Sequence, residues 1–290
     1  MGCKRTVFFI LTFIVALSCV WAQDDLLLSS VPICYGEESF IARINERTGG
    51  QREPIGLVLT GGSARALAHI GVLKYLEEHE VVPDFIISNS MGSIIAMTYA
   101  AGLSPDQILR LCTSVDIGSL FDLSLPLGRG LLATDGFESL VASILGEGLS
   151  IENLQIPVMI VSEDLVTKRQ VRICSGDFYS IFTASYALPV FFTPVKFNGH
   201  LLTDGGIASI APLNAAYEYG SCNIVSTTFY SGKNTNLNNP ITVLNTAIDI
   251  GKRRSGMEEI MAHPDVLWIR CDVEDFSFME FSAGALMAEK

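Results

Sequence analysis

The chain has 290 residues, of which 49% are hydrophobic and only 17% are charged, a composition that excludes an intrinsically disordered protein. Its 19 basic residues against 31 acidic ones leave a formal net charge of −12, which disfavours nonspecific binding to nucleic acid. We therefore expect an ordered domain with a sizeable core and no nucleic-acid partner.

The first 22 residues have the pattern of a secretory signal peptide. Lys4 and Arg5 precede a mostly apolar stretch over 7–20, and a small residue, Ala22, stands directly before Gln23. The stretch is shorter than the roughly 20 apolar residues that a membrane-spanning helix needs. The sequence thus predicts a signal peptide over 1–22 and an exported protein, periplasmic or secreted. Residues 16–19 also loosely resemble a bacterial lipobox, so the alternative is a lipoprotein anchored to the membrane through Cys19.

After a mixed, polar N-terminal extension or linker over 23–54, apolar runs alternate with helical stretches through a single domain over 55–290. Strands are expected at 55–59, 85–87, 158–161, 170–173, 224–228 and 266–269. Helices are expected over 65–80 and 91–101, and a further one begins at Ser104 and Pro105, which suit the N-cap and the first helical position. This alternation predicts an α/β fold with a largely parallel sheet that helices cover on both faces.

Cysteine and acidic residues give no sign of a metal site. The five cysteines after the leader are widely scattered, odd in number and form no CxxC pair, which argues against both a disulfide framework and a zinc site. We expect most to be buried as small apolar residues, with one bridge left open. No acidic cluster has the spacing of a calcium loop, so no metal or other cofactor is expected. The five are Cys34, Cys112, Cys174, Cys222 and Cys271.

The segment 85–96 runs from an apolar strand through a turn of small residues directly into a helix, with Ser90 at the apex. This is the context of a nucleophile elbow, in which a tight turn lifts the serine hydroxyl clear of the sheet. The N-terminus of the following helix favours developing negative charge. Gly92 supplies a small neighbour, and Ser88 stands where the first glycine of G-x-S-x-G usually is. An ordinary strand–loop–helix with a capping serine is the alternative.

Consecutive glycines lie between the first expected strand and its helix. The backbone N–H groups of Gly61, Gly62 and Ser63 can converge on an anion, either a phosphate or a tetrahedral oxyanion. A dinucleotide-binding G-x-G-x-x-G is not matched, because Ser63 and Ala66 replace its second and third glycines. The pattern therefore favours an oxyanion hole. Arg65 would begin the helix and brace this loop, or else lie on the surface.

A third segment places Asp204 at the end of an apolar stretch, directly before Gly205 and Gly206. Such a turn suits a carboxylate that points into a site, although a routine Asp-Gly turn has the same sequence.

Together, the three segments resemble the patatin-like phospholipases, here of an exported, bacterial type. Members of that family carry a G-G-G-x-R-G loop, a G-x-S-x-G elbow and a D-G-G or D-G-A motif in this order. Flanking sequence over 67–73, 184–195 and 264–266 is also similar, and the resemblance covers about residues 55–275. It implies a three-layer α/β/α sandwich with a mainly parallel central sheet. It also implies ester hydrolysis by a Ser–Asp dyad without histidine or metal.

The resemblance assigns a role to each motif residue. Ser90 would be the nucleophile and Asp204 its general base, while the loop amides of residues 61–63 would hold the oxyanion. The substrate would be a phospholipid or another acyl-ester lipid, as for a phospholipase A or lysophospholipase. The apolar stretch 120–132 would flank the acyl pocket or touch a membrane surface, or else be a buried connection. The supporting motif residues are Arg65, Ser88, Gly92, Gly205 and Gly206.

Three motif glycines are replaced, which keeps two alternatives open. A left-handed backbone at Ser63 would cost on the order of 1 kcal/mol, and the loss of one oxyanion donor costs about 10²–10³ in rate. The protein would then be a catalytically degenerate member with a lipid-binding or scaffold role. The other alternative is an α/β-hydrolase esterase with a triad of Ser90, Asp204 and His263, the only histidine after that aspartate.

Overall fold

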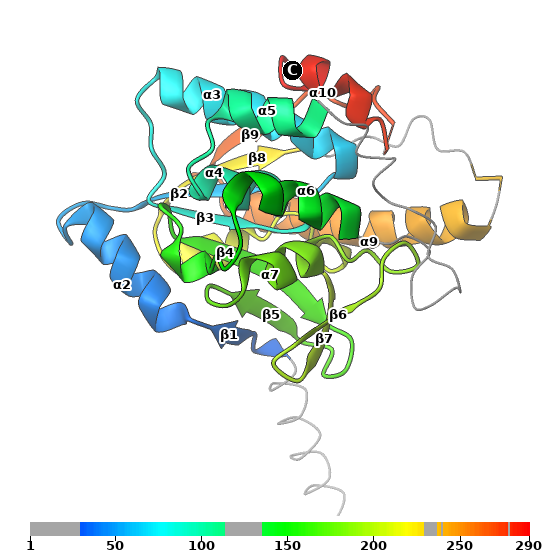
Figure 1. Cartoon of the computed structure of the whole chain (residues 1–290), viewed down its shortest axis with the longest axis horizontal. Coiled ribbons are helices and arrows are strands. Elements are labelled where there is room, and N and C mark those ends of the chain that lie inside the picture. The colour runs from blue at the N-terminus through cyan, green and yellow to red at the C-terminus, as the bar shows by residue number, and fades with distance from the viewer. Residues whose placement is uncertain (1–29, 114–134, 229–236, 239, 278) are drawn as a thin grey trace, which may run out of the picture.

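The computed structural model describes residues 30–113, 135–228, 237–238, 240–277 and 279–290 (Figure 1). The predicted signal peptide over 1–22, Cys19 and the stretch 120–132 lie outside the described residues. Within them the five described cysteines are free thiols.

A nine-stranded sheet forms the centre of the molecule, with the path β1-β5-β4-β3-β2-β8-β9. Off this path, β7 pairs with β4, and β6 pairs with β7. The strands β4, β3, β2, β8 and β9 are mutually parallel, as is the β1–β5 pair, so the prediction of a mainly parallel sheet is confirmed. The β4–β5, β4–β7 and β6–β7 pairs are antiparallel. The strands are β1 (Ile33–Tyr35), β2 (Ile55–Leu59), β3 (Phe85–Ser88), β4 (Val158–Asp164), β5 (Gln170–Ile173), β6 (Val195–Phe197), β7 (His200–Asp204), β8 (Cys222–Thr227) and β9 (Leu267–Arg270).

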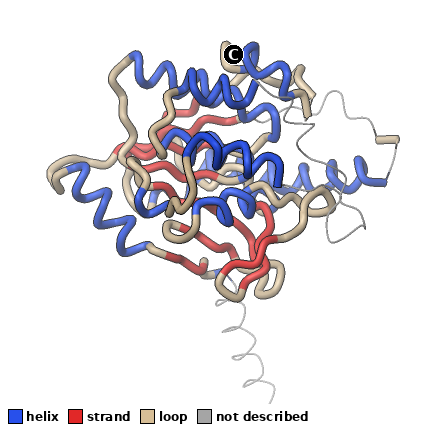
Figure 2. Tube along the Cα trace, viewed as in Figure 1, coloured by secondary structure: helices blue, strands red, loops and turns tan. Residues whose placement is uncertain are grey.

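Helices cover both faces of the sheet, which makes the predicted three-layer α/β/α sandwich (Figures 1 and 2). Alternate side chains of β2 enter different cores: Leu57 and Leu59 pack with α3–α7 and α10, whereas Val58 packs with α2, α8 and α9. No helix in the described ranges has the length and apolar character needed to cross a bilayer. The helices are α2 (Glu37–Thr48), α3 (Ala68–Glu78), α4 (Ser90–Ala100), α5 (Pro105–Thr113), α6 (Asp135–Leu145), α7 (Phe178–Ser185), α8 (Leu213–Tyr217), α9 (Pro240–Ala262) and α10 (Gly284–Met287), with short 3₁₀ segments η1 (Ser63–Leu67), η3 (Ile151–Asn153), η4 (Gly205–Ile207) and η5 (Phe281–Ala283).

The N-terminal part of the described chain differs from the linker expected over 23–54. β1 adds an edge strand to the sheet by pairing with β5, and Phe40 and Ile44 of α2 are buried in the core. A strand of three residues is too short for an alternating pattern to reveal, which is why the sequence did not indicate it. The domain therefore includes residues well before 55.

A change of partner along β4 brings two distant segments together. β4 pairs with β3 up to Ser88 opposite Ile160, and two residues later it pairs with β7 through Ser162 opposite Asp204. Two residues of a strand span about 7 Å. β7 therefore takes the place of β3 beside β4, and it delivers Asp204 next to the turn that follows Ser88.

Candidate active site

The turn from β3 into α4 holds Ser90 in a strained conformation. Its φ of +51° is left-handed, which is rare for a residue other than glycine, and it is the first residue of the helix. The helix also approaches β2 closely, because a Cβ added to Gly92 would lie 2.5 Å from the carbonyl oxygens of both Leu59 and Thr60. These features are those expected of a nucleophile elbow.

Asp204 is buried at the end of β7 and lies beside Ser90, and both residues line the same cavities. Its Oδ1 accepts from the Gly206 N–H at 2.8 Å, and a Cβ added to Gly206 would lie 3.1 Å from that oxygen and 3.7 Å from the Ser90 Cβ. Burial raises the pKa of Asp204 to about 6, against the opposing effect of the Ser90 side chain, the Gly206 amide and the Lys252 charge. A Cβ on Gly205 would meet the Val161 carbonyl oxygen at 2.2 Å, so this turn lies tight against β4. The structure thus joins the two residues that the sequence proposed as nucleophile and base.

The glycine loop after β2 lies beside Ser90, but it offers fewer free amides than the sequence predicted. The Gly61 N–H donates to Asn89 Oδ1 at 2.9 Å and is therefore already engaged. The amides of Gly62 and Ser63 donate to no atom of the residues that the structure describes. Of the three amides that the sequence predicts for an oxyanion, only those of Gly62 and Ser63 are thus left for an acceptor. Ser63 has a φ of +52°, the left-handed conformation that the replaced glycine would adopt without strain.

Asn89, which the sequence analysis passed over, joins the elbow to both neighbouring loops. Its Oδ1 holds the Gly61 amide, and its Nδ2 donates to the Ser209 carbonyl oxygen at 2.7 Å. On the opposite side, the Thr228 hydroxyl donates to the Gly61 carbonyl oxygen at 2.7 Å. Asn89 occupies the variable second position of G-x-S-x-G, so the motif itself gives no reason to single it out.

His69 supports the same loop through a hydrogen bond at its start. Its Nε2 lies 2.8 Å from the Thr60 carbonyl oxygen, and its Nδ1 lies 2.8 Å from the Ser226 hydroxyl. A carbonyl can only accept, so Nε2 donates and Nδ1 accepts. Burial lowers the pKa of His69 to about 4, which keeps the ring neutral. His69 therefore positions the loop and does not reach the reacting atoms.

Arg65 links the loop to the C-terminal segment 276–290. The side chain is buried, and its Nε donates to the Phe276 carbonyl oxygen at 2.8 Å. The same segment lies against α3, where a Cβ on Gly71 would meet the Ala288 carbonyl oxygen at 1.9 Å. Of the two roles expected for Arg65, the structure shows the brace.

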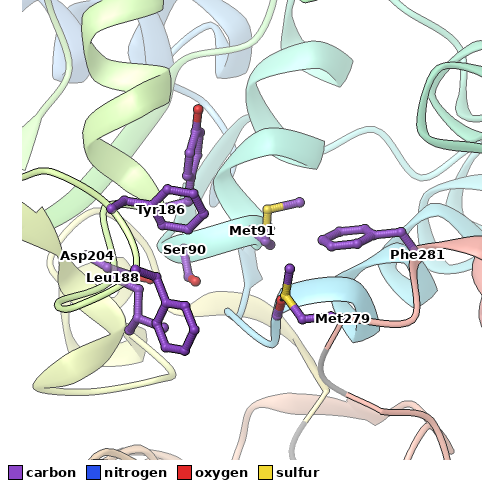
Figure 3. A pocket seen from close by; sticks show the side chains of 10 residues that line it. Ser90, Met91, Tyr186, Leu188, Asp204, Met279 and Phe281 are labelled. Atoms are coloured by element: carbon purple, nitrogen blue, oxygen red, sulfur yellow. The ribbon is translucent and has the colours of Figure 1, made fainter. Parts of the chain in front are cut away.

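An apolar pocket opens at Ser90 (Figure 3). Tyr186 and Leu188 lie on one side of the serine, with Met91, Met279 and Phe281 on the other. The pocket encloses about 420 Å³, including space open to solvent, which is within the range of small-molecule sites. Its lining, which we call the apolar pocket, consists of Ser63, Ser90, Met91, Tyr186, Leu188, Phe191, Phe192, Asp204, Met279 and Phe281.

A second hollow of about 280 Å³ meets the same two residues and has a different chemistry. Glycines of the loop and of the turn after Asp204 form part of its wall, and Lys252 of α9 adds a cation. Its lining, which we call the polar hollow, consists of Gly61, Gly62, Ser63, Ser90, Leu188, Asp204, Gly206, Ile210 and Lys252.

His263 is not assembled with Ser90 and Asp204. Its Nε2 is paired with Asn214 Oδ1 at 2.9 Å, and its ring stacks on Tyr217 with 3.7 Å between centroids. It lines neither the apolar pocket nor the polar hollow. In this structure His263 packs at the end of α9 and does not contact the two residues that the triad alternative joins to it.

The chain is similar to known proteins over the region that contains Ser90 and Asp204. A family model for the patatin-like phospholipases matches residues 57–217. An uncharacterized NTE family protein of Mycobacterium tuberculosis is 32% identical over 170 residues, which cover 58% of this chain and 47% of that protein. Patatin-like phospholipase domain-containing protein 6 of Mus musculus is 30% identical over 192 residues, or 63% of this chain and 14% of its own length. The chain thus spans less than half the length of these relatives.

Among solved structures, VipD from Legionella pneumophila aligns with a TM-score of 0.46 and 13% identity, covering 82% of this chain and 67% of that one. The type III effector protein ExoU aligns with a TM-score of 0.36 and 14% identity, over 73% and 53% of the two chains.

Proposed function

The chain belongs to the patatin-like phospholipase family, and from this premise we propose that it is a serine acyl-ester hydrolase of lipids, with Ser90 as nucleophile and Asp204 as general base. The observation that carries the proposal is the position of Ser90, on a strained turn, beside the buried carboxylate of Asp204 in the wall of a pocket. No histidine is needed, because the raised pKa of Asp204, about 6, makes the carboxylate a stronger base than an exposed one.

The proposed reaction proceeds through an acyl-enzyme. Asp204 takes the hydroxyl proton while Ser90 Oγ forms a bond to the ester carbonyl carbon, and the amides of Gly62 and Ser63 hold the oxyanion. The intermediate then collapses with loss of the alcohol, which leaves with the proton from Asp204. Water next attacks the acyl carbonyl carbon and gives a proton to Asp204. The bond to Ser90 Oγ then breaks, Oγ takes this proton back from Asp204, and the fatty acid is released. The apolar pocket is proposed to take the acyl chain.

Substitution of the two residues tests this mechanism. Ser90→Ala and Asp204→Asn should each lower hydrolysis of a short-chain ester and of a lysophospholipid by about 10³-fold or more. His263→Ala is the matched control and should stay within a few-fold of the wild type, because its ring packs on Tyr217 away from the pocket. A fluorophosphonate probe should label the wild type and fail to label Ser90→Ala.

Two outcomes would redirect the proposal. A loss in His263→Ala as large as in Ser90→Ala, with unchanged circular dichroism, would restore the triad. A wild type that shows neither turnover nor labelling would favour a degenerate, lipid-binding member of the family. In that case the strained backbone at Ser63, whose φ is +52°, would be the first explanation to test for the missing activity.

We also propose that the protein is exported, on the basis of the N-terminal pattern alone. Lys4, Arg5 and the apolar stretch 7–20 support a signal peptide that ends before Gln23. Mass measurement of the mature N-terminus decides the matter. A start at Gln23 supports soluble release, an acylated Cys19 indicates a lipoprotein, and a retained Met1 or Gly2 would contradict both.

A further inference from the structure

A single cation from a distant helix lies in the wall of the polar hollow. Lys252 belongs to α9, and the Ile210 N–H donates to its carbonyl oxygen at 3.3 Å, which fixes this turn of the helix beside the segment that follows Asp204. The Lys252 side chain is only 14% exposed. Its positive charge also acts on Asp204, whose pKa it lowers. Lys252 therefore lines the same hollow as Ser90 and Asp204.

The ammonium group is held in place by a neighbour on its own helix. Lys252 Nζ lies 3.0 Å from Asp249 Oδ1, and that carboxylate is itself only 16% exposed. Arg253 approaches the other oxygen of Asp249 at 3.9 Å, so the carboxylate is shared. An ammonium group has three donors, and a single carboxylate does not use them all. Lys252 is thus oriented and still able to bind an anion in the hollow.

The two cavities at Ser90 differ in the chemistry of their linings, as the apolar acyl half and the polar alcohol half of a phospholipid ester differ from each other. Beyond the residues that both share, one is lined by aromatic side chains and methionines, whereas the other is lined by three glycines, an isoleucine and a lysine. An ester whose carbonyl carbon lies at Ser90 must direct its acyl chain and its alcohol away from each other. With the acyl chain in the apolar pocket, the alcohol half occupies the polar hollow.

We propose that Lys252 recognises a phosphate group on the alcohol half of the lipid ester and thereby selects phosphate-bearing lipids over neutral ones. This inference rests on the proposed hydrolase function and names a specificity-determining residue for it. A lysine donates charge-assisted hydrogen bonds to phosphate, and partial burial strengthens them relative to water. The chain carries a net charge of −12, so a cation in the wall of the hollow offsets the overall repulsion of an anionic substrate.

A matched pair of substrates isolates the phosphate. A monoacylglycerol and the corresponding monoacylglycerol 3-phosphate share the acyl chain and the ester bond and differ only in that group. The ratio of their kcat/KM values is measured at pH 8, where Asp204 is ionised, for the wild type, Lys252→Gln, Lys252→Arg and Arg253→Gln. Arg253→Gln is the control, because it removes the same charge one residue away and Arg253 lines neither cavity.

Lys252→Gln should reduce the ratio of phosphorylated to neutral substrate about tenfold, whereas Lys252→Arg should restore much of it and Arg253→Gln should leave it near the wild-type value. Glycerol 3-phosphate should inhibit neutral-ester hydrolysis competitively in the wild type and about tenfold more weakly in Lys252→Gln. Inorganic phosphate is tested in the same assay. If it also inhibits, and does so more weakly in Lys252→Gln, the hollow binds free phosphate as well as a lipid headgroup.

The inference is overturned if Lys252→Gln lowers both substrates by the same factor, because the lysine would then act only through Asp204. It is also overturned if Arg253→Gln changes the ratio equally, because a general field effect would explain both. These outcomes require an active wild type. Absence of hydrolysis of either substrate by the folded wild type would instead reject the proposed function itself.

Discussion

The elbow at Ser90 and the glycine loop after β2 lie side by side at the ends of two parallel strands, and in each a serine replaces a glycine of the family motif. At the elbow the replacement is Ser88, which lies within β3 and has an ordinary extended backbone. In the loop the serine is Ser63, whose φ is +52°, and Ala66 replaces a further glycine. The same change in sequence therefore leaves one backbone relaxed and the other strained.

This comparison shows that a motif glycine can answer two separate physical needs. At Ser63 the need is conformational, because the backbone is left-handed whatever space is available. At Gly61 and Gly92 the need is steric: an added Cβ would lie 2.6 Å from the Ser90 Cβ in the first case and 2.5 Å from two carbonyl oxygens in the second. Position 66 does not require glycine, because the φ of Ala66 in η1 is negative, and alanine is therefore tolerated there.

The two segments also differ in the titratable group that each faces. The elbow is paired with Asp204, whose pKa burial raises to about 6. The glycine loop rests on His69, whose pKa burial lowers to about 4. Burial thus favours the neutral form of both groups, which is the main form below about pH 6 for Asp204 and above about pH 4 for His69. Because the two pKa values differ, the pH dependence of activity distinguishes the two groups.

The largest expected effect is on activity below pH 6. Asp204 acts as a base only when ionised, so kcat/KM should fall about tenfold for each pH unit below its pKa of about 6. A pH profile of ester hydrolysis measures this, with circular dichroism to confirm that the protein stays folded. Ser63→Gly should leave the acid limb at the same pH, because it alters the other segment. A limb near pH 4 would assign it to His69 or to an unshifted carboxylate instead.

Asp204→Asn should stabilise the fold while it abolishes hydrolysis. Because the folded-state pKa of Asp204 is raised from 3.8 to about 6, this group favours the folded state fully below pH 3.8. That contribution is lost as the pH rises through 6. At pH 8 the substitution should raise the free energy of unfolding by about 1–3 kcal/mol, measured by urea denaturation.

At pH 3.5 the gain from Asp204→Asn should disappear, because the wild-type carboxyl is then mostly protonated in both states. A variant that is less stable than the wild type at pH 8 would mean that the hydrogen bonds of Asp204 outweigh the cost of burying its charge.

The sequence predicts the parts of this site that lie on strand ends, because a strand followed by small residues is a local pattern. The elbow, the glycine loop and the turn after Asp204 all end strands of one sheet. The mainly parallel sheet and the helices on both faces are also predicted, since continuous apolar runs mark strands buried on two sides. What the sequence cannot give is the change of partner along β4 that brings β7 beside β3.

The residues that were missed act over long sequence separations. Lys252 reaches the polar hollow because the Ile210 N–H holds its carbonyl oxygen, a contact that no local pattern encodes. Asn89 and His69 lie within or beside the motifs, but their roles depend on partners such as Ser209 and Ser226, far away in the chain. The short strand β1 and half-buried strands such as β6 carry too weak a periodicity to be recognised.

Restoring glycine in the loop should relieve its strain. Ser63→Gly should raise the free energy of unfolding by about 0.5–1 kcal/mol, because a left-handed backbone costs a residue with a Cβ about 1–2 kcal/mol and part of that gain is offset by greater freedom of the unfolded chain. Urea denaturation at neutral pH measures the change. Ser63→Ala is the matched control and should give no such gain, since it keeps the Cβ. An equal gain in Ser63→Ala would point to the hydroxyl and not to the backbone.

An effect of similar size, with the reverse order of variants, is expected at the elbow. Ser88 is fully buried in β3, and its Oγ has no hydrogen-bond partner among the described residues. Ser88→Ala should therefore raise the free energy of unfolding by about 0.5–1 kcal/mol, because it removes an unsatisfied polar group while keeping the Cβ.

Ser88→Gly, which restores the family motif, should be about 0.5–1 kcal/mol less stable than Ser88→Ala, because the extended backbone gains nothing from glycine and the unfolded chain becomes freer. The stability order is thus glycine above alanine at Ser63 and alanine above glycine at Ser88, measured for all four variants under one set of urea conditions. If glycine were also the more stable choice at Ser88, the elbow would need glycine for its own backbone. The contrast between a conformational and a steric requirement at the two segments would then be lost.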